Sequence, residues 1–201
     1  MKIKIIHRDS FTQQDMDDLL RLLSTRDAND INYDVEDWES KSHTLLYSFL
    51  KTPRFCSDQG GLMLAYDNEQ CCCVSGYSRS NFNSDVFILG GRTYIDPQYR
   101  HQLLMSSVII PSQLEKIFGV AKMAVFLFDR KNEFNLYDIF VSGKLNLFLK
   151  NKYYKFRDIW DNLQAVPHPI SIYTGIIQNA LYIKLDPEFE FDWMKLEANN
   201  V

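Results

Sequence analysis

The sequence predicts an α+β fold in which helices flank a mixed β-sheet. Residues 62–77 form two apolar runs joined by a short polar turn, which is typical of an antiparallel hairpin. Residues 86–89 and 123–128 are continuously apolar, as expected for strands covered on both faces. Because a helical segment lies between these two runs, we expect them to pair in parallel at the centre of the sheet.

The composition is that of one folded domain with a substantial core. The chain has 201 residues, of which 46% are apolar and 24% charged, and Gly and Pro are few. This balance excludes disorder over most of the length, and we expect a single domain over residues 1–201. The formal net charge of −4 gives no electrostatic basis for extensive nucleic-acid binding, so nucleic acid is not an expected partner.

A cytoplasmic protein that binds no membrane is predicted. The first ten residues do not make a signal peptide, and no run approaches the roughly 20 apolar residues of a membrane span. Three of the four cysteines, Cys71, Cys72 and Cys73, are consecutive, which does not suit a disulfide framework. The run has no second Cys or His cluster at ligand spacing, so we expect a buried strand and no metal site.

A strand and two helices are predicted first along the chain. Residues 1–7 alternate apolar and charged side chains, as in a strand with one solvated face, and Ser10 or Thr12 can cap the helix that follows. A second helix is predicted over residues 35–51. The acidic segment 27–39 is either a solvated face or an entrance for a cationic substrate. The apolar residues of the first helix recur at helical spacing: Met16, Leu19, Leu20, Leu22 and Leu23.

The central elements are the hairpin and a long helical segment. Asp67 and Asn68 tolerate the left-handed conformation that a tight hairpin turn needs. Residues 98–118 carry apolar side chains near a 3.6-residue period, and Gly119 is placed to end this helix. Pro111 should kink or split it. The helix begins beside the carboxyl end of the preceding strand, which is the natural position for an anion site.

The last third of the chain is predicted to contain a helix and late strands. The helix covers residues 132–150, the strands cover 170–173 and 180–185, and the acidic tail 186–201 is expected to be ordered in part through its aromatic side chains. Residues 144–160 combine five basic residues and one acid with interleaved aromatics. This segment is either a solvated helix or loop or a surface that binds nucleic acid, an acidic carrier protein or the 3′-phosphate of CoA.

The order of these elements resembles that of the GNAT superfamily of acyl-CoA-dependent N-acyltransferases. Residues 74–77 (Val-Ser-Gly-Tyr) are similar to the end of the family's third strand. Residues 92–100 (Arg-Thr-Tyr-Ile-Asp-Pro-Gln-Tyr-Arg) resemble its fourth strand and the aromatic-Arg that opens the cofactor loop. Residues 136–138 (Leu-Tyr-Asp) resemble the Leu-Tyr-Glu of the helix after strand five. The resemblance covers residues 1–145, and residues 145–201 are poorly matched.

The resemblance implies an α/β/α arrangement with a mostly antiparallel twisted sheet and a central parallel strand pair. It also implies acetyl-CoA or another acyl-CoA as co-substrate, and direct acyl transfer to a small-molecule or peptide amine. Tyr137 would be the catalytic acid that protonates the departing thiolate, and a backbone N–H near Tyr94 and Ile95 would polarise the thioester carbonyl. The cofactor-binding loop would comprise Arg100, His101, Gln102, Leu103, Leu104 and Met105.

This cofactor loop, residues 100–105, departs from the family pattern. The family places glycines after the aromatic-Arg, and none of the corresponding residues here is glycine. Each Cβ crowds the path of the phosphates, although a helix end still supplies free N–H groups and a dipole. Gly90 and Gly91 lie earlier, and they predict a bulge or bend in the fourth strand that would help part the central strands for the pantetheine arm.

The sequence leaves alternatives open both for the general base and for the function. Residues 86–95 contain no acid or His, so the candidate bases are Asp85, Glu69 and His43, unless a water relay or an already neutral amine removes the need for one. One other function is a GNAT-fold binding or regulatory module without CoA chemistry. Another is a carrier-protein or nucleic-acid binding protein that uses residues 144–160.

Overall fold

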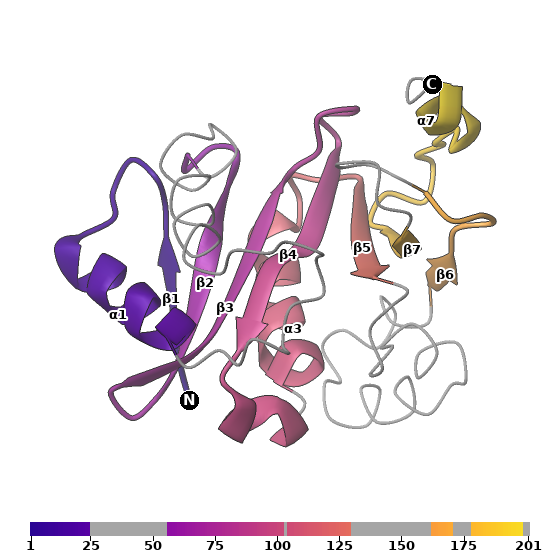
Figure 1. Cartoon of the computed structure of the whole chain (residues 1–201). Coiled ribbons are helices and arrows are strands. Elements are labelled where there is room, and N and C mark those ends of the chain that lie inside the picture. Colours follow the sequence, from indigo (N-terminus) through magenta and orange to yellow (C-terminus); the bar gives the residue numbers. More distant parts are fainter. Residues whose placement is uncertain (25–55, 103, 130–161, 171–177, 199–201) are drawn as a thin grey trace. The chain divides into compact units, whose positions relative to one another are not determined.

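The computed structural model describes residues 1–24, 56–102, 104–129, 162–170 and 178–198 (Figure 1). Outside the described residues lie the predicted helices 35–51 and 132–150, the predicted strand residues 171–173, the acidic segment 27–39 and the basic segment 144–160. Within the described part of the chain, no helix is long and apolar enough to cross a membrane. Two compact units are formed: Met1–Arg79 with Gly90–Gln113, and Ser80–Leu89 with Leu114–Val201.

The first unit contains a hydrogen-bonded set of strands. Their order is β1 (Lys2–Ile6), β2 (Gly60–Asp67), β3 (Gln70–Arg79) and the carboxyl-terminal part of β4 (Val86–Ile95). The β1–β2 and β2–β3 pairs are antiparallel, which confirms the predicted first strand and hairpin. Asn68 in the hairpin turn has a φ of 54°, the left-handed conformation expected there.

The consecutive cysteines lie in β3, and their side chains are buried as predicted. Cys72 falls where the β2–β3 register shifts between Ala65 and Tyr66, so the run contains a β-bulge. Burial raises the pKa of the Cys71 thiol to about 12 and also raises the pKa values of Cys72 and Cys73. These thiols are therefore protonated at neutral pH and behave as small apolar side chains.

Helix α1 (Gln13–Ser24) covers one face of this sheet. The Thr12 hydroxyl accepts the Asp15 N–H at 3.3 Å, and the Asp15 carboxylate accepts the Thr12 N–H at 2.8 Å, so Thr12 caps the helix. Of the apolar residues at helical spacing, Leu20 lies outside the stripe that faces the sheet and is 40% exposed. The core on this face contains Ile6, Leu19, Leu22, Leu23, Leu62, Leu64, Tyr66, Cys71, Val74 and Tyr94.

Three short helical elements replace the single helix expected over residues 98–118. They are the 3₁₀ helix η3 (Pro97–Gln102), the π-helix η4 (Met105–Ile109) and α3 (Ile110–Ile117). The Ile110 N–H donates to Met105 O, five residues back, and Pro111 has no N–H to donate. The split expected at Pro111 is therefore present. Gly119, with a φ of 80°, follows the end of α3 as predicted.

The second unit contains the parallel pair. The amino-terminal part of β4 pairs with β5 (Met123–Asp129) from Val86↔Met123 to Leu89↔Phe126, which confirms the predicted mixed sheet. β7 (Gln178–Lys184) pairs with β5, and β6 (Leu163–Ala165) pairs with β7, both antiparallel. Of the strand expected at 170–173, Ile170 makes only an isolated bridge to Gln178. The sequence reasoning missed β6 and the short helix α7 (Met194–Ala198).

The carboxyl-terminal tail packs through its aromatic side chains, as expected. The ring centroids of Phe191 and Trp193 lie 4.8 Å apart in an edge-to-face arrangement, and those of Tyr182 and Trp193 lie 5.3 Å apart. Together with Phe189 they cover a core around Met123 on β5. The tail is thus part of the second unit's hydrophobic core.

Candidate functional site

Among the described residues of the first unit, the side-chain amide of Gln113, in α3, is a highly constrained polar group. Gln113 is fully buried, and its Oε1 accepts the N–H of Gly90 on β4 at 3.0 Å. Its Nε2 lies 3.1 Å from Ser75 Oγ, 3.3 Å from Ser75 O and 3.2 Å from Gly76 O, all on β3. The orientation of the amide is fixed, because an N–H can only donate and a carbonyl can only accept. One side chain thus joins α3, β3 and β4.

The hydroxyls of Ser75 and Thr93 complete a ring of hydrogen bonds with Gln113 and Gly90, which we call the polar ring. Thr93 Oγ1 donates to Gly90 O at 2.7 Å, and Ser75 Oγ lies 2.8 Å from Thr93 Oγ1. Because the only hydroxyl proton of Thr93 goes to a carbonyl, Ser75 must be the donor to Thr93. Every bond of the ring therefore runs in the same direction.

The polar ring surrounds a left-handed residue in β4. Gly90 has a φ of 73°, a conformation that glycine adopts without steric cost, so the predicted bend in the fourth strand is confirmed. A Cβ at Gly90 would meet only ordinary contacts, 3.7 Å from Ile110 Cδ1 and from Met105 Cε. The backbone conformation, rather than lack of space, is therefore what requires glycine here.

The backbone of β4 beyond the bend presents N–H groups away from β3. The Asp96 N–H donates to Cys72 O on β3 at 2.9 Å. Since residues of an antiparallel strand alternate between facing the neighbour and facing away, Ile95 and Thr93 face away and Tyr94 faces β3. In agreement, the Ile95 carbonyl accepts from Arg100 Nε at 3.2 Å. Of the two residues expected to polarise a thioester carbonyl, Ile95 therefore has the suitable N–H direction.

Residues of the predicted cofactor loop occupy different environments. Arg100 is exposed, and its guanidinium lies 5.8 Å from the centroid of the Tyr94 ring. His101 and Gln102 complete η3, which Tyr99 joins to the hairpin by donating to Asp67 at 3.1 Å. Leu104 is buried in a core cluster and the half-buried Met105 packs against it, so the side chain of Leu104 cannot reach a ligand. Leu103 lies outside the described residues, as does Tyr137.

The candidate bases lie in three different settings. The Asp85 carboxylate, in the second unit, lies 3.2 Å from Lys122 Nζ. Glu69 is exposed in the turn of the hairpin, and His43 lies outside the described residues. Neither described carboxylate belongs to the polar ring. Sequence reasoning missed Gln113, Ser75 and Thr93, and no spacing in the sequence marks these three residues as partners.

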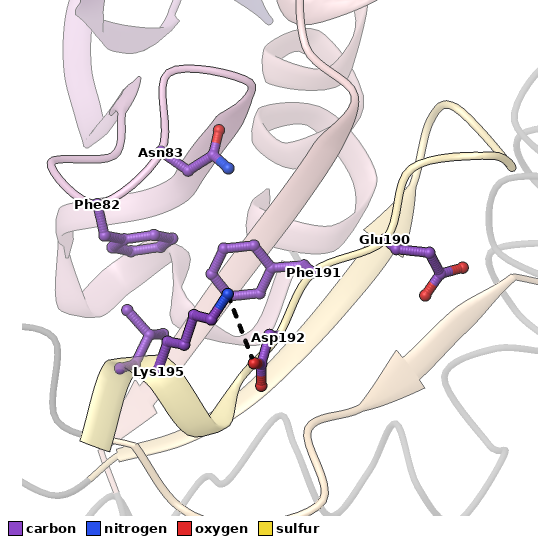
Figure 2. A pocket seen from close by; sticks show the side chains of 7 residues that line it. Phe82, Asn83, Glu190, Phe191, Asp192 and Lys195 are labelled. Carbon is purple, nitrogen blue, oxygen red and sulfur yellow. Dashed lines mark ion pairs between the residues drawn. The ribbon is translucent and has the colours of Figure 1, made fainter. Parts of the chain in front are cut away.

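A separate open hollow of about 510 Å³ lies in the second unit (Figure 2). Phe82 and Phe191 form its apolar part, with ring centroids 5.5 Å apart. Its charged groups have partners: Lys195 lies 3.8 Å from Asp192, and Glu190 accepts from Lys184 at 2.6 Å. The charged groups of the hollow therefore present no uncompensated charge to a ligand.

No model of a protein family and no curated protein matches the sequence. Solved structures do match. An acetyltransferase of the GNAT family from Staphylococcus aureus is 13% identical, with a TM-score of 0.52 over 92% of this chain and 100% of that one. A mutant of the spermidine N-acetyltransferase of Vibrio cholerae is 9% identical, with a TM-score of 0.51 over 92% of this chain and 95% of that one.

The chain therefore has the GNAT fold. The structural likeness covers 92% of its length and so extends past residue 145, where the sequence offered no match. The expected α+β fold with a mixed sheet is thereby confirmed.

Proposed function

We propose that this chain is a cytoplasmic N-acyltransferase that moves an acetyl or other acyl group from a CoA thioester directly to an amine. The observation that carries the proposal is the fixed backbone of β4 beyond Gly90 in a chain that has the GNAT fold. There the N–H of Ile95 faces away from β3, and Arg100 holds the carbonyl of the same residue. A fixed N–H at such a position can stabilise the oxyanion that forms when a thioester is attacked.

In the proposed mechanism, the thioester carbonyl oxygen accepts the Ile95 N–H and the amine nitrogen attacks the carbonyl carbon. The carbon–nitrogen bond forms, the carbon–sulfur bond breaks, and Tyr137 protonates the departing thiolate. Residues 86–95 contain no acid or His, so the amine arrives neutral or loses its proton to water. The acceptor is a small-molecule or peptide amine, and the spermidine specificity named for the Vibrio cholerae enzyme makes polyamines the first to test.

Arg100 and the backbone N–H groups of residues 101–105 are proposed to hold the CoA pyrophosphate. The absence of glycine from this loop restricts how closely the phosphates approach, which gives the arginine a larger share of the binding. This glycine-free loop is also what favours the second candidate function, a binding or regulatory module of the same fold without CoA chemistry.

Calorimetric titration with acetyl-CoA tests the proposal. We expect binding in the micromolar range, and we expect Arg100→Ala to weaken it about fivefold to tenfold, as for the loss of one exposed charge-assisted contact. Arg21→Ala is the matched control, because Arg21 is an exposed arginine on α1 to which no part in CoA binding is given. If acetyl-CoA does not bind, or if both variants weaken it equally, the cofactor site is misplaced.

A further inference from the structure

The polar ring has one exposed side chain, that of Thr93, whose hydroxyl oxygen can form a hydrogen bond with an acceptor amine. We propose that Thr93 Oγ1 accepts a hydrogen bond from an N–H of the acceptor amine and so orients the nitrogen lone pair toward the thioester carbonyl. This inference rests on the proposed function, to which it adds the residue that receives the nucleophile. Gln113 and Ser75 act through Thr93 and are positioning residues.

The direction of the ring makes Thr93 Oγ1 an acceptor only. Its proton is donated to Gly90 O, and the Ser75 hydroxyl donates to it in turn. The Ser75 hydroxyl is itself held by Gln113 Nε2 at 3.1 Å, and Gln113 is held by the Gly90 N–H. An sp³ hydroxyl oxygen has two lone pairs, and the ring uses one. The second lone pair suits a ligand that donates, as an amine N–H does.

Thr93 carries the exposed side chain of the ring. Gln113 and Ser75 are fully buried, and Gly90 is half-buried. Because Ser75 and Gln113 have no exposed polar surface, Thr93 is the side chain through which their hydrogen bonds can influence a ligand. The arrangement is that of a buried scaffold that fixes one exposed oxygen.

The spacing along β4 fits the reacting atoms. Thr93 and Ile95 are two residues apart on β4, so their Cα atoms lie about 7 Å apart, since a strand rises about 3.3 Å per residue. Hydrogen bonds of about 2.9 Å made by the Thr93 hydroxyl and by the Ile95 N–H span most of that distance, which leaves the amine nitrogen and the thioester carbonyl within roughly the 3–3.5 Å that attack requires. The nitrogen uses its lone pair to form the new bond, while the proton that it loses goes to water.

An amide N–H of the pantetheine arm of CoA offers Thr93 the same hydrogen bond as the amine does. The test therefore measures the two ligands separately. Thr93→Val removes the oxygen and keeps the shape of the side chain, and Thr93→Ser keeps the oxygen. Each is assayed for release of CoA thiol from acetyl-CoA with spermidine and with a lysine-containing peptide, and for the Kd of acetyl-CoA by calorimetry.

We expect Thr93→Val to lower kcat/KM for the amine about tenfold to a hundredfold while the Kd of acetyl-CoA changes less than about twofold, and Thr93→Ser to retain most of the activity. Equal kcat/KM in wild type and Thr93→Val would overturn the inference. A weakened Kd of acetyl-CoA with unchanged use of the amine would overturn it too, because the hydrogen-bond donor would then be pantetheine. If the wild-type protein acetylates neither amine, the proposed function fails for these acceptors and this inference fails with it.

Discussion

A Gln113→Leu variant is expected to lose roughly 3 kcal/mol or more of its free energy of unfolding. The substitution leaves the Gly90 N–H and the carbonyls of Ser75 and Gly76 without the partner they have in the native structure. Each buried polar group that loses its partner costs on the order of 1–3 kcal/mol. Urea denaturation measures the difference, and a loss below about 1 kcal/mol would contradict the role given to this side chain.

Gln70→Leu is the matched control for this variant. Gln70 is exposed at the start of β3, so Gln70→Leu is the same substitution made at a surface position. Surface substitutions of this kind change the free energy of unfolding by about 0.5 kcal/mol or less. A comparable loss in both variants would assign the effect to the loss of glutamine in general rather than to the polar ring.

A Gln113→Glu variant adds a test of charge at nearly constant shape. The carboxylate cannot donate to the two β3 carbonyls, and burial disfavours its charged form, so its pKa in the folded state should rise above the usual value of about 4.3. The folded state then binds more protons than the unfolded state, so its stability falls as pH rises through this window. The deficit relative to wild type should therefore shrink as the pH is lowered from 7 to 5.

Tyr137→Phe is expected to lower kcat by about a hundredfold to ten-thousandfold, the range that general acid catalysis contributes. The aromatic ring is kept and only the phenolic hydroxyl is removed, so KM for acetyl-CoA should change little.

The control for the Tyr137 prediction is Tyr182→Phe. Tyr182 lies on β7, where its hydroxyl donates to Gln164 at 2.7 Å, and it is a tyrosine to which no catalytic role is given. It should keep its kcat within about twofold of wild type. A Tyr137→Phe variant that keeps half or more of the wild-type kcat would remove Tyr137 from the mechanism.

The strands and α1 could be predicted because their signals are local. The hairpin follows from two apolar runs around Asp67 and Asn68, and the parallel pair follows from two continuously apolar runs separated by a helical segment. Pro111 has no N–H to donate, and Gly119 readily adopts a positive φ. The split and the end of the helical segment could therefore be predicted from these two residues alone. The three-residue β6 is too short to show an alternation, and its side chains are half-buried or exposed.

The polar ring could not be predicted, because its members come from separate elements. Ser75, Thr93 and Gln113 are brought together by the pairing of β3 with β4 and by the packing of α3, neither of which leaves a spacing in the sequence. Leu104 illustrates the same limit, since its position in the loop pattern did not indicate that its side chain enters the core. The directions of the Tyr94 and Ile95 N–H groups likewise depend on the strand register.

The most direct test of the central claim is whether the purified protein forms an acetylated amine from acetyl-CoA. The protein is incubated with acetyl-CoA and either spermidine or a lysine-containing peptide, and both the CoA thiol and the acetylated amine are quantified by mass spectrometry. The account predicts one acetylated amine for each CoA released, with a rate that rises with pH as the amine becomes neutral. Tight binding of acetyl-CoA with no acetylated amine from either acceptor would contradict it and would favour the binding module.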